Sequence, residues 1–211
     1  MKLIAVILFS YLLLLFTNSK SYAEDMTVSV SSKRLSLLQQ IYTGAEYKSF
    51  SKSAPAFGIQ FSIDRGHDII RYYLKGRFTY SESQQSFLNS VSPFTSRFNF
   101  ASAGAELGFN LYPFLQRPKG FSTYVNFAGV GSYNQLEMET VPSGSKFSKN
   151  EQAFSYGYGG GLGLEWLIDP AQTKTRWLLF GEIGYRYEVT ALAQQNAFEI
   201  SGLMASFGFG F

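Results

Sequence analysis

Cysteine is absent from this 211-residue chain, and charged residues make up only 16% of it. The missing cysteine excludes a disulfide scaffold, a Cys-ligated zinc site and a cysteine nucleophile. The charged fraction lies well below the roughly 25% of an average soluble domain. The chain also lacks a series of apolar runs of about 20 residues, and its mean hydropathy is only −0.03. Together these features exclude a protein that crosses a membrane with several helices.

Dense runs of basic residues are missing as well. The net charge is +3 and the pI is about 9.0, so we expect no nucleic-acid partner. Aromatic residues, in contrast, are abundant at 18%, with 21 Phe and 14 Tyr. This content excludes a disordered chain.

The N-terminus has the three-part order of a secretory signal. Lys2 precedes an apolar run over residues 3–16, and Ser21 and Ala23 place small residues before a cleavage site. The alternative is a membrane anchor helix, but the run is short for a membrane span. We therefore predict a cleaved signal peptide over residues 1–23 and a single exported domain over residues 24–211.

Beyond residue 50, apolar residues recur at every second position, which is the pattern of β-strands. The segment 154–168, for example, sets Tyr156, Tyr158 and Leu162 against glycines. Seven such segments are predicted strands: 57–63, 70–80, 101–111, 121–133, 154–168, 177–189 and 203–211. An eighth strand is expected within 34–47, although Leu38 and Tyr42 interrupt its alternation, and residues 26–30 could begin it or precede it.

The connections alternate in length along the chain. Residues 64–68, 112–120 and 169–173 form compact turns, whereas residues 81–96 and 139–151 are longer and rich in Ser, Gln and Asn. Short turns at one end and long loops at the other are typical of outer-membrane barrels. We predict an all-β, eight-stranded antiparallel transmembrane β-barrel with an up-and-down meander topology.

The alternation leaves open which face is wet, because a soluble barrel would turn its apolar face inward. The polar face favours a membrane barrel, since it combines many glycines with long side chains of both signs. Such charges can pair inside a narrow lumen, where an isolated charge is costly. The predicted lumen charge network consists of Arg71, Lys75, Arg77, Glu106, Glu165, Glu182, Arg186 and Glu188.

Aromatic residues gather near the strand ends, where membrane interfaces favour them. The expected belt at the short-turn end contains Trp166, Trp177, Tyr112 and Phe211. The expected belt at the opposite end includes Tyr80, Phe98, Phe154, Tyr156 and Tyr187.

The last strand carries Phe207, Phe209 and the C-terminal Phe211 at alternate positions. This strand is similar to the assembly signal of bacterial outer-membrane barrels, and the whole exported part resembles the small OmpA-like, OmpX-like and opacity-protein barrels. The resemblance implies insertion into the bacterial outer membrane by the barrel assembly machinery, contact with outer-membrane lipid, periplasmic termini and a monomeric state.

No residue pattern predicts catalysis. The single histidine, His67, falls in a compact turn on the periplasmic side, and no Gly-x-Ser-x-Gly or phosphate-loop motif occurs. Asp64, His67 and Asp68 form too weak a set for a metal site. We expect no enzyme activity, no cofactor and no metal.

The expected function is a structural or surface role. The barrel would have a plugged polar lumen and would support envelope integrity or surface interaction through its extracellular loops, with a ligand that the sequence does not name. Two alternatives remain open: a narrow, low-conductance pore for small solutes, and a soluble secreted barrel that binds a ligand.

Overall fold

A computed structural model of the chain describes residues 30–44, 47–48, 55–66, 69–88, 93–113, 120–141, 147–168, 177–190 and 198–211. The predicted signal peptide and His67 lie outside the described residues. Within the described ranges, no helix has both the length and the apolar character needed to cross a membrane.

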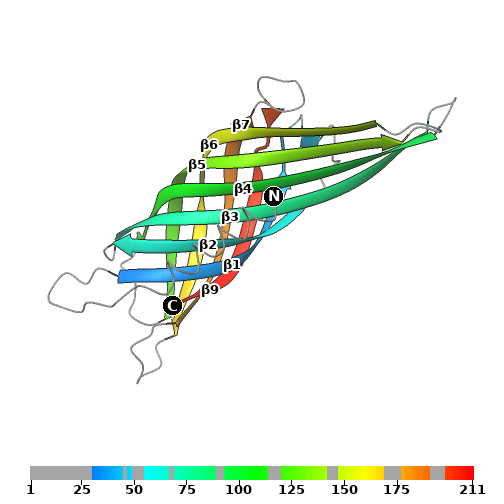
Figure 1. The fold of residues 1–211 in the computed structure, drawn as a ribbon. Coiled ribbons are helices and arrows are strands. Elements are labelled where there is room, and N and C mark those ends of the chain that lie inside the picture. Colours follow the sequence, from blue (N-terminus) through cyan, green and yellow to red (C-terminus); the bar gives the residue numbers. More distant parts are fainter. Residues whose placement is uncertain are drawn as a thin grey trace.

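The described chain consists of antiparallel strands that close into a barrel (Figure 1). Each strand pairs with the next, the β6–β7 pair completes the meander, and β1 pairs with β9 to close it. The short β8 and the longer β9 both pair with β7, so they form one interrupted strand of an eight-stranded barrel. The predicted fold class is thus confirmed. The strands are β1 Val30–Tyr42, β2 Ala56–Gly66, β3 Ile70–Leu88, β4 Pro93–Leu111, β5 Gly120–Val141, β6 Phe147–Ile168, β7 Trp177–Thr190, β8 Phe198–Glu199 and β9 Gly202–Gly210.

The described part of the first strand runs over Val30–Tyr42, and residues 26–29, where it could start, lie outside the described residues. Leu35, Leu37 and Ile41 face outward on it, whereas Leu38 and Tyr42 are buried inside. These two residues therefore do not break the alternation. They are apolar residues on the inward face, which becomes apolar toward the upper end of the barrel.

The strands tilt strongly around the barrel axis. Following hydrogen-bonded partners once around the barrel leads from Tyr80 to Ile70 on the same strand, ten residues lower; the residues along this row are Tyr80, Phe57, Gln39, Ala205, Ile183, Leu162, Val125, Leu111 and Ile70. Such a stagger is the geometric condition for closing a narrow barrel. At this strand number, side chains are just able to fill the interior.

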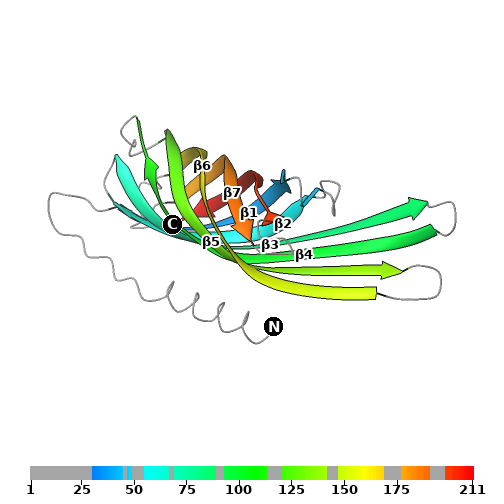
Figure 2. The same cartoon turned by 90° about the horizontal axis from the view of Figure 1, so that it is seen from above.

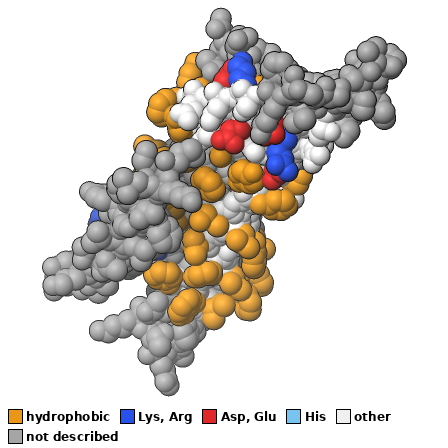
Figure 3. Space-filling view, turned by 45° about the vertical axis from the view of Figure 1, so that its right-hand side comes forward, with side chains coloured by type: hydrophobic (Ala, Val, Ile, Leu, Met, Phe, Trp, Pro, Cys, Tyr) orange, Lys and Arg blue, Asp and Glu red, His pale blue; other side chains and the backbone are white. Residues whose placement is uncertain are grey.

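The outer wall is apolar and the interior is polar. Large hydrophobic side chains such as Leu37, Leu107 and Phe207 are exposed, while Arg71, Glu165 and other charged residues are buried. Figure 3 shows the hydrophobic side chains on the visible face as a band, with charged residues above it. This arrangement suits a wall that contacts lipid.

The prediction of long loops at 81–96 and 139–151 was wrong. β3 runs to Leu88 and β4 starts at Pro93, while β5 runs to Val141 and β6 starts at Phe147. These strand extensions project beyond the rest of the barrel (Figure 2). We call the upper parts of β3–β6 (residues 81–88, 93–100, 136–141 and 147–153) the raised sheet. Because Ser, Gln and Glu are frequent in these segments, their composition resembled that of a loop.

The closing pair of β1 and β9 can be tested by cysteine cross-linking, since the chain has no cysteine of its own. Leu37 and Phe207 are direct partners, and antiparallel partners lie about 4.5–5.5 Å apart, within disulfide range. The variant Leu37→Cys/Phe207→Cys should form an internal disulfide upon oxidation, detected by its migration on a denaturing gel. The control Leu37→Cys/Phe211→Cys shifts one partner by about 13 Å along the strand and should remain reduced. The opposite pattern would contradict the register.

Candidate functional site

The lumen contains equal numbers of acidic and basic side chains. Among the described residues facing inward, five acids and five bases are buried to 5% exposure or less: Asp64, Glu106, Glu165, Glu182 and Glu188, with Arg34, Arg71, Lys75, Arg77 and Arg186. Burying an unpaired charge is costly, so an equal count is the first condition for a dry lumen. These ten residues form three tiers along the barrel, and each tier is neutral.

The lower tier joins Arg34 and Arg71 with Asp64 and Glu165. Arg34 lies between both acids, with Nη2 2.8 Å from Asp64 Oδ2 and Nη1 2.6 Å from Glu165 Oε1. Tyr112 donates its hydroxyl to Glu165 at 2.7 Å, and the Arg71 guanidinium lies over its ring, 5.0 Å from the centroid. Arg71 Nη1 is 3.7 Å from Asp64 Oδ2. Each charge in this tier thus has an opposite charge beside it.

The middle tier is a single ion pair. Lys75 Nζ donates to Glu182 Oε2 at 2.7 Å, and the Tyr124 hydroxyl donates to Glu182 Oε1 at 2.6 Å. The Tyr124 ring occupies the space left by Gly163, because a Cβ at that glycine would lie 2.1 Å from the ring. Gly163 of β6 therefore makes room for the Tyr124 ring, which reaches from β5 over β6 to Glu182 on β7.

The upper tier joins two arginines and two glutamates. Arg77 contacts Glu188, Arg186 contacts Glu106, and Arg77 Nε lies 3.8 Å from Glu106 Oε1. The Gln40 carbonyl accepts from Arg77 at 3.2 Å and from Arg186 at 3.5 Å, which ties the two pairs together. The tier is thus a connected network rather than two independent ion pairs.

Above the upper tier, the interior becomes apolar. We call Tyr42, Tyr47, Ala56, Phe98, Phe100, Leu136, Phe198 and Ile200 the mouth cluster. The Tyr47 ring packs edge-on against Phe98 and Phe100, with centroids 5.4 and 5.3 Å apart. A smaller apolar cluster of Leu167, Leu178 and Phe180 lies toward the lower end. Apolar side chains thus lie near both ends of the described lumen, with the charge tiers between them.

The outer surface changes character at the same height as the interior. The last outward aromatic of β3 is Tyr80, and the next outward residues of the strand are the exposed Glu82 and Gln84. On β4, Arg97 is exposed and its Nε lies 3.2 Å from Glu82 Oε1. Below this level the outer wall is apolar and the lumen holds the charge tiers. Above it, among the described side chains, Glu82, Gln84 and Arg97 are exposed outside and Phe98, Phe100 and Leu136 are buried inside. The switch marks the level at which lipid gives way to water.

The structure places all eight residues of the predicted charge network inside the lumen. Sequence analysis missed Arg34 and assigned Asp64 to a turn, whereas Asp64 belongs to β2 and binds Arg34. The alternation did contain this signal, because Asp64 lies two and four residues after Ser62 and Gln60 and therefore shares their face of the strand. Arg34 likewise falls on the inward face of β1.

Seven of the nine residues of the predicted aromatic belts are exposed on the outer wall, including Phe154 and Tyr156, and their role as membrane belts stays a prediction. Tyr80, Trp166, Trp177, Tyr187 and Phe211 are exposed on the outer wall, and the rings of Trp177 and Phe211 lie 6.1 Å apart.

The belt assignment of Tyr112 was wrong, because this residue is only 1% exposed and supports the lower tier. The assignment of Phe98 was also wrong, because it lies in the mouth cluster. Both residues face inward, so proximity to a strand end was a poor guide to their side. Phe207 and Phe209 face outward with Phe211, and their role as an assembly signal stays a prediction.

The middle tier offers the cleanest test of the lumen. Glu182→Gln keeps the side-chain size but leaves Lys75 as an uncompensated buried charge, and it should lower the free energy of unfolding by about 3–5 kcal/mol. The double variant Lys75→Met/Glu182→Leu should restore most of the loss. Urea unfolding in lipid vesicles, followed by tryptophan fluorescence, measures both.

The matched control is Glu82→Gln. It removes an acid from an ion pair in which both side chains are about half exposed, so the change should stay within about 1 kcal/mol. Equal urea midpoints for wild type and Glu182→Gln would contradict the buried pair.

Comparison with known proteins gives remote similarities. No protein-family model matches the chain, and no curated protein matches its sequence. Among solved structures, the attachment invasion locus protein Ail of Yersinia pestis is 16% identical, with a TM-score of 0.39 over 88% of this chain and 100% of that one. Neisserial surface protein A is 12% identical, with a TM-score of 0.37 over 85% and 95%. CarO of Acinetobacter baumannii is 11% identical, with a TM-score of 0.37 over 88% and 97%.

The identity of the fold rests on the chain's own geometry. The meander closes through β1 and β9, its outer wall is apolar between aromatic belts, and its lumen holds neutral tiers of charge. The chain is therefore a small eight-stranded β-barrel of the bacterial outer membrane.

Proposed function

We propose that this barrel is non-conducting and non-enzymatic, and that it acts in surface interaction through the raised sheet. The main support for this proposal is that the polar outer face of this sheet is backed by the packed mouth cluster. A folded, polar surface that stands above the membrane is suited to contact partners outside the cell. The lumen, in contrast, is filled by paired side chains.

The charge tiers support a closed lumen. An ion entering from either end would have to separate pairs such as Lys75–Glu182 and displace apolar side chains such as Phe100. Each separated charge would lose its partner in a region with little water, which is energetically costly. A pore that exchanges its ion pairs to open would meet this barrier at all three tiers.

The buried serine cluster supports the non-enzymatic assignment. Ser132 and Ser155 lie 2.7 Å apart, and Ser155 donates to Glu188 at 2.8 Å. A nucleophile needs a base and access to substrate, yet these hydroxyls are buried and Glu188 is engaged by Arg77. The cluster thus satisfies the carboxylate rather than activating a serine.

The raised sheet combines several exposed groups on a defined surface. Glu82, Gln84, Arg97 and Glu137 project outward, while Phe98, Phe100 and Leu136 anchor the same strands from behind. Because those anchors are buried, side chains on the outer face can be changed without disturbing the barrel. We place the raised sheet outside the cell and both chain ends in the periplasm. The barrel would be monomeric, with Phe207, Phe209 and Phe211 read by the assembly machinery.

Trimming the raised sheet tests the surface role. Ser83 and Phe98 are partners, as are Met138 and Lys149, so each hairpin can be shortened by an Asn-Gly turn between these positions. Bacteria that carry the trimmed barrel should lose most of the adhesion to epithelial monolayers that wild type confers, at least fivefold in bound cells. Heat-dependent gel migration should still report a folded barrel.

Charge reversals on the sheet serve as the control that keeps the barrel intact. Arg97→Glu with Glu137→Lys should weaken adhesion, whereas Glu182→Gln in the lumen should act only through stability. Resistance to detergent and to large antibiotics should be unchanged in the trimmed strain. Unchanged adhesion with a loss of that resistance would overturn the surface role in favour of envelope integrity.

A further inference from the structure

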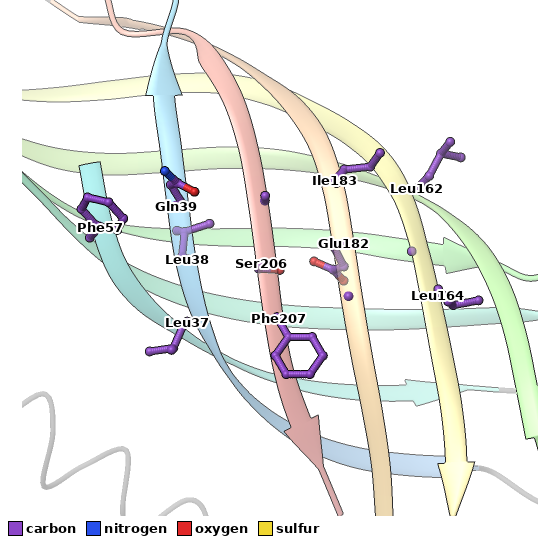
Figure 4. A pocket seen from close by; sticks show the side chains of 13 residues that line it. Leu37, Leu38, Gln39, Phe57, Leu162, Leu164, Glu182, Ile183, Ser206 and Phe207 are labelled. Carbon is purple, nitrogen blue, oxygen red and sulfur yellow. The ribbon is translucent and has the colours of Figure 1, made fainter. Parts of the chain in front are cut away.

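A recess in the lipid-facing wall is the least explained feature of the described surface. It lies across β1, β9, β7 and β6, where the last strand meets the first, and its volume is about 690 Å³. A second recess of about 460 Å³ adjoins it and shares residues with it. Small residues, Gly181 and Ala205, leave the space, and larger apolar side chains border it: Leu37, Phe57, Leu162, Leu164, Ile183 and Phe207. Figure 4 shows Leu37 and Phe57 on one side and Leu162 and Leu164 on the other.

Three polar side chains line this recess, Gln39, Glu182 and Ser206 (Figure 4). Glu182 is buried and binds Lys75, and Ser206 accepts a hydrogen bond from Gln60. Gln39 differs from them because it lies on the outer face. It is exposed on the outward face of β1, where Leu37 and Ile41 are its neighbours along the strand. Its partners across the strands are Phe57 and Ala205, so the surrounding described wall offers its amide no polar side chain. A polar group in hydrocarbon without a hydrogen bond is unfavourable. We therefore expect a hydrogen-bonding group of a membrane lipid to pair with this amide.

The depth of Gln39 identifies which leaflet supplies that partner. The hydrogen-bonded row around the barrel descends in eight steps from Tyr80, at the upper edge of the apolar wall, to Ile70 at the lower edge. Gln39 is two steps from Tyr80 and Ala205 is three. The recess therefore lies in the half of the apolar wall next to the raised sheet. Since the proposed function places that sheet outside the cell, the inference rests on it, and the recess opens into the outer half of the bilayer, somewhat below the headgroups.

We propose that this recess binds an acyl chain of lipid A, the outer-leaflet lipid, and that Gln39 hydrogen-bonds the 3-hydroxyl group near the head of that chain. A hydroxyl both donates and accepts, which matches the carbonyl and amino groups of the Gln39 amide. A plain acyl chain would fill the recess but leave the amide unsatisfied. A second copy of the barrel fits less well, because a two-fold contact would set one recess against another and leave a void.

The chain offers a substitution that fills the recess. A Cβ built at Gly181 has only the Ser206 carbonyl oxygen within 4 Å, at 3.8 Å, so Gly181→Leu should place its side chain in the recess without a clash. The matched control is Gly129→Leu, because Gly129 is also exposed and a Cβ there has nothing within 4 Å. Gln39→Leu removes the amide and keeps a comparable apolar bulk.

The test is native mass spectrometry of the refolded full chain, released from nanodiscs that contain either lipid A with 3-hydroxyacyl chains or dioleoyl phosphatidylglycerol. Wild type and Gly129→Leu should retain one lipid A. Gly181→Leu should retain at least tenfold less, and Gln39→Leu about fivefold less lipid A with no change for phosphatidylglycerol. Gel migration before and after heating checks that every variant is folded.

Three results would overturn the proposal. Equal lipid A retention by wild type and Gly181→Leu would show that the recess is not the site. Equal retention of both lipids by wild type, unaffected by Gln39→Leu, would show that the amide recognises nothing. A wild-type dimer that disappears in Gly181→Leu would assign the recess to a second copy of the chain.

Discussion

The need to pair every buried charge governs the inside of this barrel. Among the described residues, ten charged side chains are buried inside, and five acids face five bases. The numbers of acids and bases are equal within each tier, and opposite charges lie next to each other in it. Removing one member of a tier leaves an isolated buried charge, which is far more costly than never having the pair. The narrow girth of eight strands makes this requirement strict, because side chains nearly fill the interior.

The second constraint is the thickness of the membrane. Whether a strand segment turns its apolar face outward or inward depends on whether that segment lies within the bilayer or above it. Between the aromatic belts, residues such as Leu107 and Phe207 face lipid. Above Tyr80, the same strands hold Phe98, Phe100 and Leu136 inside and expose Glu82 and Arg97. One continuous strand thus belongs to two environments. The mouth cluster follows from this switch and packs behind the raised sheet, where we propose that it closes the lumen.

Period-two alternation was enough to predict the strands, their number and the meander, because the two faces differ sharply between the belts. The same alternation also identified the charged face. Two of its residues were missed, because Asp64 was assigned to a turn and Arg34 was overlooked. Composition failed above the membrane: polar residues at 81–96 and 139–151 suggested loops where paired strands exist. Tyr112 and Phe98 failed for a related reason, since nearness to a strand end does not define the side. The recess at Gln39 requires three-dimensional neighbours, which one sequence does not supply.

We propose that the lumen supports the fold and that the two outer surfaces, one facing water and one facing lipid, are the working parts. In this proposal, paired charges and the mouth cluster close the lumen. Planar-bilayer recording of the refolded full chain tests this claim most directly. We expect no discrete current steps in 1 M KCl for wild type. Steady single-channel steps that change size in Glu182→Gln would show that ions pass through the middle tier and would contradict the account.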